Sequence, residues 1–208
     1  MITVSPVLMA MLALALVQPL GAEAQTLSQK EKTAVLNALN RQRADLKQPP
    51  AIALPMLTWD PALETIAHSW ALSCTADSGG SLLAHNPDRS AGYPGSVGEN
   101  IAGWRGPLTL ASLMNAVNQW GGEALDYNIV RNTCAGEPNS IHHQWRKCAH
   151  YTQIVSATTT KVGCARSVCP NLAFPITIVC NFGNAGNVYD AATGTVNRPY
   201  ELTAAGGR

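Results

Sequence analysis

The amino-acid sequence predicts a single α+β domain with a mostly antiparallel sheet. Helical patterns fill the first part of the chain, whereas segments rich in β-branched and aromatic residues gather near its end. Helices followed by strands, rather than a regular alternation of the two, are typical of α+β folds. The length of 208 residues suits one domain, and the 17 glycines and 13 prolines predict many loops between its elements.

The charge balance argues against two classes of protein. Fourteen Lys and Arg residues against thirteen Asp and Glu residues give a net charge of +1, whereas a general nucleic-acid-binding protein normally carries a basic excess. A hydrophobic content of 46% with so small a net charge also excludes an acidic disordered chain. Only 13% of the residues are charged, against a usual value of about 25%, so ion-pair networks cannot be the main source of stability.

Residues 1–24 are expected to form a signal peptide. No side chain in residues 1–22 is charged, residues 7–17 form an apolar run, and Ala-Glu-Ala at 22–24 has the small-x-small form of a cleavage site. We therefore expect a mature chain of residues 25–208, secreted to the cell exterior or to a periplasm. The alternative is an uncleaved membrane anchor. No other segment is apolar over such a length, so the mature chain is expected to contain no transmembrane segment.

Three helices are expected in the first part of the mature chain. Ser28 and Glu31 form a capping box that starts the first helix. Asp60 as N-cap and Pro61 as first helical residue predict the second, whose apolar residues recur at three- and four-residue steps. The third is expected over residues 108–119, where the apolar residues again follow a helical spacing.

Two long loops and three strands complete the predicted fold. Residues 75–107 and 128–147 are rich in loop-forming residue types, and a loop of such length in a compact domain is usually functional or disordered. Residues 150–159, 160–168 and 176–182 are rich in β-branched and aromatic side chains, which predicts β-strands.

Six cysteines, an even number, lie in the expected mature chain. Export to an oxidising compartment favours three disulfides, for which spacing alone leaves fifteen pairings open. A zinc–thiolate site is the alternative, but no Cys-x-x-Cys pair occurs. The cysteines are Cys74, Cys134, Cys148, Cys164, Cys169 and Cys180.

A series of short motifs resembles one protein family. In order, the chain contains Asn40-x-x-Arg43, Trp59-Asp60, Gly98-Glu99-Asn100-Ile101, Trp120-x-x-Glu123, His150-Tyr-Thr-Gln-Ile-Val155 and Cys180-Asn-Phe182. Over residues 28–200 this series resembles the CAP superfamily, which includes cysteine-rich secretory proteins, antigen 5 proteins and plant pathogenesis-related proteins type 1. The segment 180–200 is stretched relative to the family pattern, which affects surface loops rather than the fold.

The resemblance implies one CAP (SCP) domain over residues 25–208. Its fold would be a three-layer α-β-α sandwich with a mostly antiparallel central sheet. The implied disulfides, which would staple this sandwich, are Cys74–Cys169, Cys134–Cys148 and Cys164–Cys180.

The resemblance also implies a cleft that contains two histidines and two glutamates, here His85, Glu99, Glu123 and His150. His85 and His150 would be direct ligands of a divalent cation such as Zn²⁺, which the fold does not require. Glu99 and Glu123 would orient the imidazole rings or a bound water. Two carboxylates beside neutral imidazoles carry a charge of about −2, which attracts a cation. The alternative is a polar network that only braces the long loop against the sheet.

An enzymatic reaction is the less favoured interpretation. The chain lacks His-Glu-x-x-His and Gly-x-Ser-x-Gly, and its cysteines are expected in disulfides. Ser156 follows His150 by six residues, which would place both on one face of the predicted strand, but we consider a Ser–His pair a weak alternative.

The sequence leaves three functions open. The first is a secreted defence-type or virulence-type module that binds an unknown protein partner. The second is a carrier of a small lipid or sterol, and the third is a metal-dependent hydrolase. We expect a monomer with no nucleic-acid partner. Trp104 is the best candidate for an exposed ligand platform, whereas His68 and the pair at 142–143 are expected to be solvated.

Overall fold

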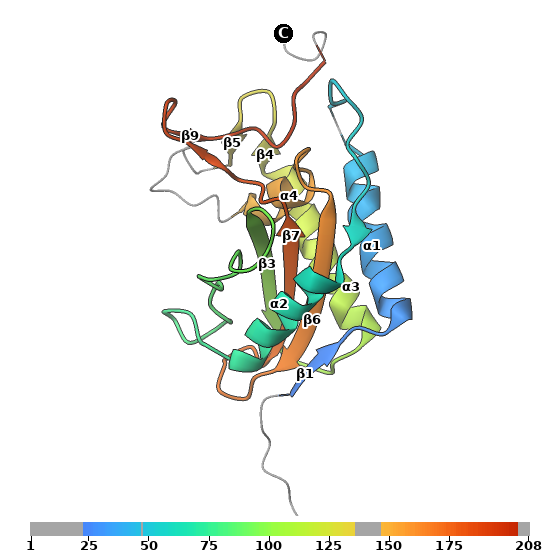
Figure 1. Ribbon diagram of the computed structural model, residues 1–208, viewed down its shortest axis with the longest axis vertical. Helices are drawn as coiled ribbons and strands as arrows, with labels where there is room; N and C mark the ends of the chain where they lie inside the picture. The colour runs from blue at the N-terminus through green and yellow to red at the C-terminus, as the bar shows by residue number, and fades with distance from the viewer. Residues whose placement is uncertain (1–22, 47, 136–146, 204–208) are drawn as a thin grey trace, which may run out of the picture.

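The computed structural model describes residues 23–46, 48–135 and 147–203. It confirms the predicted α+β class: a mainly antiparallel central sheet lies between two helical layers (Figure 1). The main path of the sheet runs β1-β6-β7-β3, and the two-residue strand β2 joins β6 in parallel. The strands are β1 (Glu23–Thr26), β2 (Thr58–Trp59), β3 (Val97–Trp104), β6 (Lys161–Val168) and β7 (Ile176–Gly183).

Each face of the sheet supports its own core. Helices α1 (Gln29–Ala44), α3 (Leu110–Gly122) and α4 (Ala149–Ile154) cover one face, and α2 (Pro61–Ser73) covers the other. All eight residues of β7 are buried, because this strand has neighbours on both edges and helices over both faces. Along it, Ile178 faces the first core and Val179 the second, which is the alternation of a strand between two layers.

The expected starts of the first two helices agree with the structure, whereas the third helix begins at Leu110 instead of residue 108. Ser28 and Glu31 form the predicted capping box, and Asp60 Oδ1 accepts from the first amides of α2. Helix α3 continues through residues 121 and 122, beyond the expected end at 119. Gly121 permits a close contact there, since a β-carbon at this position would lie 2.5 Å from the side chain of Gln42 on α1.

The predicted strand over residues 150–159 is wrong, because Ala149–Ile154 forms α4. The prediction rested on β-branched and aromatic content, but residues 151 to 156 are uniformly buried, and a short segment that is buried on all sides has no period that distinguishes a strand from a helix. Ser156 and His150 therefore do not lie on one face of a strand.

The predicted long loop over residues 75–107 is wrong in its last part. Residues 97–104 form β3, which pairs with β7 from Val97↔Gly183 to Trp104↔Ile176. Two glycines and two polar residues give this strand the composition of a loop, so the sequence did not predict it. Gly98 is required by packing, since a β-carbon there would overlap the side-chain amide of Gln153.

Two short hairpins lie in segments expected to be irregular. β4 (Tyr127–Asn128) pairs with β5 (Thr133–Cys134), and β8 (Tyr189–Asp190) pairs with β9 (Thr195–Val196). The remainder of the predicted 128–147 loop, from 136 to 146, lies outside the described residues.

All six cysteines form disulfides, in the pairing that the resemblance implies. Cys164–Cys180 joins residues that lie opposite each other on β6 and β7. Cys74–Cys169 joins the end of α2 to the end of β6, and Cys134–Cys148 joins β5 to the start of α4.

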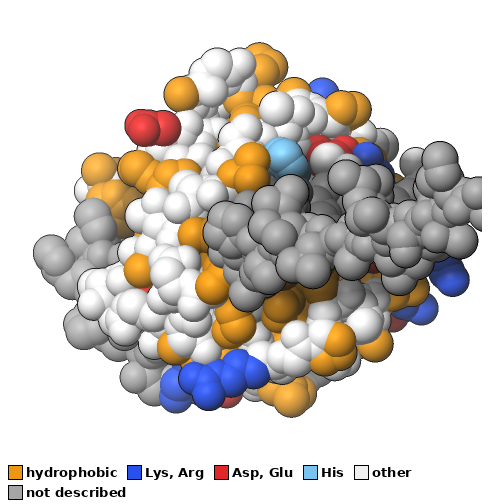
Figure 2. All heavy atoms as spheres, turned by 90° about the horizontal axis from the view of Figure 1, so that it is seen from below, with side chains coloured by type: hydrophobic (Ala, Val, Ile, Leu, Met, Phe, Trp, Pro, Cys, Tyr) orange, Lys and Arg blue, Asp and Glu red, His pale blue; other side chains and the backbone are white. Residues whose placement is uncertain are grey.

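The expected signal peptide falls largely outside the described residues. Strand β1 begins at Glu23, so it includes two residues before the expected mature start, and cleavage after residue 24 stays a prediction. Within the described ranges, no helix combines the length and the hydropathy needed to cross a bilayer. The face seen from the β1 end carries few charged side chains, as the low charged content of the sequence predicts (Figure 2).

Candidate functional site

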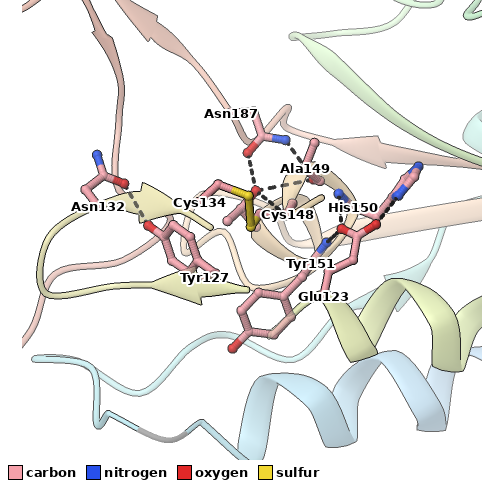
Figure 3. Close-up of a disulfide and its surroundings, with 10 residues drawn as sticks. Glu123, Tyr127, Asn132, Cys134, Cys148, Ala149, His150, Tyr151 and Asn187 are labelled. Carbon is pink, nitrogen blue, oxygen red and sulfur yellow. Dashed lines mark hydrogen bonds and ion pairs between the residues drawn. A yellow bond between two sulfur atoms is a disulfide. The ribbon is translucent and has the colours of Figure 1, made fainter. Parts of the chain in front are cut away.

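His150 and Glu123 form the first of two histidine–glutamate pairs. His150 is the second residue of α4, and Glu123 follows α3 directly. The two side chains point toward each other beside the Cys134–Cys148 disulfide (Figure 3). His150 Nδ1 lies 2.6 Å from Glu123 Oε1. Because an ionised carboxylate only accepts hydrogen bonds, the proton of the neutral imidazole is assigned to Nδ1.

Glu123 also caps α4 from outside the helix. Its Oε2 accepts from the backbone amides of His150, at 2.9 Å, and Tyr151, at 3.1 Å. These amides belong to the first turn of the helix, where backbone donors have no partner within the helix. A negative charge at this end is favoured by the helix dipole as well. One carboxylate therefore orients the imidazole and stabilises the helix that carries it.

Two further groups fix the position of His150. The ring of Trp120 stacks against its imidazole, with centroids 5.8 Å apart and planes 28° apart. Asn100 of β3 donates to the His150 carbonyl at 3.1 Å. The imidazole is thus held by Trp120 of α3 and by the capping carboxylate, while Asn100 of the edge strand holds the His150 backbone.

His85 and Glu99 form the second pair. His85 Nδ1 lies 2.8 Å from Glu99 Oε1, which also accepts from the backbone amide of Asn86 at 2.9 Å. The amide of Asn181, oriented to satisfy both of its neighbours, donates to Glu99 Oε2 at 3.2 Å and accepts from Ala67 of α2. The Glu99 side chain is 1% exposed and that of His85 61% exposed, so a buried carboxylate anchors a solvent-facing ring.

Two adjacent residues of β3, Glu99 and Asn100, contact different histidine–glutamate pairs. Glu99 lies on the face of the sheet that α2 covers, as does Ile101, whereas Asn100 contacts α4 on the opposite face. The structure thus pairs each predicted histidine with one predicted glutamate, His85 with Glu99 and His150 with Glu123. Within the described ranges, no group of three or more His, Cys, Asp or Glu residues is placed to hold a metal ion.

Arg43 is a functional residue whose role the sequence analysis did not identify. It is 3% exposed and donates to the carbonyls of Pro55, Ile154, Ser156 and Thr159 at 2.6–3.1 Å. Burial lowers the pKa of its guanidinium to about 10. The guanidinium thus binds the C-terminal end of α4, while Glu123 binds the N-terminal end, and each charge opposes the local helix dipole. A sequence signal exists, because Val35, Leu39 and Arg43 follow one another at four-residue steps on the buried face of α1.

Gln153, within the His150–Val155 motif, also has a defined role. Gln153 donates to Thr159 at 3.0 Å and accepts from the amide of Gly186 at 2.7 Å, and its side chain fills the space over Gly98. Beside it, Asn187 accepts from the Thr152 hydroxyl at 2.6 Å and donates to the Ala149 carbonyl. Three of the sequence motifs therefore meet around α4.

Burial suppresses the acidity of the phenols near this helix. Burial raises the pKa of Tyr151, and that of Tyr127 likewise, while it raises the pKa of Tyr200 to about 12. These phenols therefore stay neutral at physiological pH and act as packing and hydrogen-bonding groups.

The remaining candidates from the sequence are placed as follows. Trp104 is not an exposed platform: it is half-buried at the end of β3, where it packs against the larger core. His68 is half-buried on α2. The histidines at 142–143 lie outside the described residues.

Comparison with known proteins relates this architecture to one family. The model of the family described as "CAP: Cysteine-rich secretory protein family" matches residues 36–182. GLIPR1-like protein 1 of Bos taurus is 35% identical over 161 residues, which are 74% of this chain and 59% of the relative. The chain therefore spans about three fifths of that relative's length.

Two further similarities have higher coverage of the matched protein. Venom allergen 3 of Solenopsis invicta is 36% identical over 175 residues, 77% of this chain and 70% of the relative. The solved structure of NaASP2 with Zn²⁺ has a TM-score of 0.63 at 22% identity and covers 86% of this chain and 90% of its own, a similarity of fold.

Proposed function

The chain belongs to the cysteine-rich secretory protein (CAP) family, and we propose that it is an exported, non-enzymatic binding module whose two histidine–glutamate pairs hold a divalent cation such as Zn²⁺. Three disulfides support the export step, because they persist in oxidising compartments. The protein partner that such a module would bind is left open.

One observation carries the cation proposal. In both pairs the glutamate takes Nδ1, and Nε2 of His85 and of His150 has no hydrogen-bond partner among the described residues. A histidine that binds a metal through one ring nitrogen commonly donates its other N–H to a carboxylate, which fixes the tautomer and raises the basicity of the ligand. Each pair therefore has the form of a metal-ligating histidine with its supporting carboxylate.

The donor set fits a weakly held, open cation site. Zinc prefers four ligands, and sites with an open position complete their coordination with water. His85 and His150 would supply two nitrogens, with water at the other positions, since no larger cluster of ligands occurs within the described ranges. The presence of Zn²⁺ in the NaASP2 structure is consistent with this choice of ion.

The same hydrogen bonds argue against a hydrolase. A general base must have an accepting lone pair directed at the proton that it removes. Glu123 already accepts from three donors, and Glu99 from three. Each carboxylate is committed to holding protein groups, which suits binding better than proton transfer.

A lipid carrier receives no comparable support. A cavity of about 310 Å³ lies between α1 and α3, but Arg41, Gln42, Asp45 and Asn118 are among its lining residues. An acyl chain placed there would remove water from these polar groups without replacing their hydrogen bonds.

Calorimetric titration with Zn²⁺ tests the cation proposal. We expect His150→Ala and His85→Ala each to weaken binding by at least about 100-fold, since each removes one of two protein ligands. His68→Ala is the matched control, because this histidine lies on α2 outside both pairs, and its affinity should equal that of the wild type. Wild-type protein that binds no Zn²⁺ at neutral pH, or equal weakening in all three variants, would reject the site.

A further inference from the structure

A second cavity lies beneath the C-terminal hairpin, and its lining does not include the histidine–glutamate pairs. Its volume is about 560 Å³, within the range of about 300–1,000 Å³ found for small-molecule sites. Its walls come from β8, β9 and the segment 197–201, and its floor comes from residues 156, 158 and 185–187. None of the four residues of the proposed cation cleft lines it.

Hydroxyl and amide side chains dominate the lining of this cavity. Ser156 and Thr158 supply one hydrogen-bonded pair of hydroxyls and Thr193 and Thr195 another, and Asn197 supplies an exposed amide. Groups of both kinds can donate and accept hydrogen bonds. The apolar contribution is limited to small side chains such as Ala185 and Val188.

The charged residues of the lining disfavour an anionic ligand. Asp190 and Glu201 are acidic, and no lysine is among the described residues that line the cavity. The guanidinium of Arg198, the one in this described lining, donates to the carbonyls of Ile129 and Val130 at 3.1 and 2.9 Å. A phosphate or sulfate would therefore meet two carboxylates, with the single cation already bound to backbone.

A lipid and a metal ion are disfavoured as well. An apolar ligand would cover these hydroxyls and the Asn197 amide without satisfying the hydrogen-bonding capacity that their contacts with each other leave open, which costs about 1–3 kcal/mol for each group that is buried unsatisfied. The lining forms no cluster of three potential metal ligands among the described residues. A neutral polyhydroxylated molecule avoids both penalties, because each of its hydroxyls donates and accepts while its C–H faces require little apolar area.

We propose that this cavity binds a short neutral oligosaccharide. Its walls are organised before any ligand arrives, since Asn132 donates to the Val196 carbonyl at 2.8 Å and Asn197 donates from its backbone amide to Val188 at 2.8 Å. The floor is tied to the segment after β9, where Ala157 donates to Pro199 at 2.6 Å. Such preorganisation reduces the entropy lost on binding. This site is independent of the proposed cation cleft, and either can fail without the other.

A filling substitution with a matched control tests the proposal. Thr158 is exposed on the cavity floor, so Thr158→Trp should occupy the cavity with little cost to the core. Thr160 is also exposed, lies two residues further along the same turn and does not line the cavity, so Thr160→Trp is the control. Melting curves would establish that both variants fold.

Binding would be measured by saturation-transfer NMR and calorimetry with four probes. Chitotriose and cellotriose represent cell-wall polysaccharide, a free biantennary N-glycan represents glycoprotein glycan, and a heparin-derived tetrasaccharide is the anionic comparator. We expect at least one neutral probe to bind the wild type with a Kd between about 10 μM and 1 mM. Thr158→Trp should weaken that binding by at least about 10-fold, and Thr160→Trp should leave it unchanged. The class of neutral probe that binds identifies the source of the ligand.

Several results would overturn the proposal. The proposal fails if no neutral probe binds at about 10 mM. It also fails if only the heparin fragment binds, or if the two tryptophan substitutions weaken binding equally. Should Thr158→Trp fail to fold, Asn197→Ala replaces it. This variant removes one exposed amide from the wall and is expected to weaken binding by about 3–10-fold, and an unchanged affinity would contradict the site.

Discussion

The two histidine–glutamate pairs contain the same chemical groups but are held in different ways. His150 lies on a six-residue helix and is 27% exposed in its side chain, and its glutamate also caps that helix. His85 lies on a loop and is 61% exposed, and its glutamate is buried in the edge strand of the sheet. In the first pair the carboxylate organises the backbone. In the second the fold organises the carboxylate.

This difference has a physical origin in the length of α4. A helix of six residues is too short to be stable on its own, because nucleation is unfavourable and most of its backbone groups lie in the end turns. Its ends must therefore be satisfied from outside, by Glu123 and Arg43. In the loop that carries His85, Glu99 accepts from one backbone amide, that of Asn86, but Glu99 is itself placed by the ladder between β3 and β7.

The largest expected effect on the free energy of unfolding comes from removal of the Arg43 charge at the C-terminal end of α4. Arg43→Met preserves the aliphatic stem but leaves four carbonyls without the guanidinium, and we expect the free energy of unfolding to fall by about 3–5 kcal/mol. Urea denaturation measures the loss. Arg41→Met is the control, because this arginine is exposed on the same helix and should lose less than about 0.5 kcal/mol.

Hydrogen exchange on Arg43→Met would show whether α4, which carries His150, is stabilised separately from β3, which carries Glu99. Amides of α4 should lose protection in Arg43→Met at denaturant concentrations where the amides of β3 remain protected. A uniform loss of protection in both segments would mean that α4 is not supported separately, and the contrast between the pairs would fail.

A smaller effect is expected from two matched amide substitutions. In Glu123→Gln the new NH₂ group faces a backbone N–H in one orientation and requires His150 to move its proton to Nε2 in the other; both orientations remove the negative charge at the start of α4, and we expect a loss of about 2 kcal/mol. In Glu99→Gln the new NH₂ group can face Asn181, whose side-chain amide can rotate to present its oxygen at the loss of its hydrogen bond from the Ala67 amide. We therefore expect a loss below about 1 kcal/mol for this variant. Parallel urea titrations test the order, and an equal or reversed loss would contradict the assigned role of Glu123.

The comparison also explains what could be predicted from the sequence. Ser28, Asp60 and Pro61 act on neighbouring residues, so their patterns predicted where two helices begin. The four cleft residues were found because they lie inside motifs that resemble a family. Their division into two pairs could not be predicted, because it depends on which face of β3 each residue occupies.

Helix α4 was missed for a related reason. Its stabilising partners are distant in the chain: Glu123 is 27 residues before His150, and Arg43 is 111 residues before Ile154. The local composition favours a strand. The helix is stabilised instead by contacts with residues that are distant in the chain, which a short stretch of sequence does not contain. The strand β3 was missed because Gly98 and Gly103 lower its apparent propensity, although both are required by close packing.

The smallest expected effect is a pH dependence confined to the His85 side of the molecule. Asp60 caps α2 and accepts from the Tyr93 hydroxyl at 3.0 Å, which ties the loop that carries His85 to that helix. Burial alone would raise the pKa of Asp60. Hydrogen bonds from Ala62, Tyr93 and Lys161 outweigh it and hold the pKa below its ordinary value of 3.8.

The sign of this dependence follows from the direction of the shift. A carboxyl with a lowered pKa in the folded state adds stability above its unfolded pKa and loses that contribution as the pH falls through the folded value. We therefore expect the Tyr93 loop to lose hydrogen-exchange protection below about pH 4, before α4 does. Asp60→Asn keeps an N-capping group but cannot ionise, so the difference between the two regions should become insensitive to pH over this range. Loss of protection at the same pH in both regions of the wild type, or an unaltered pH dependence in Asp60→Asn, would show that Asp60 does not control this loop.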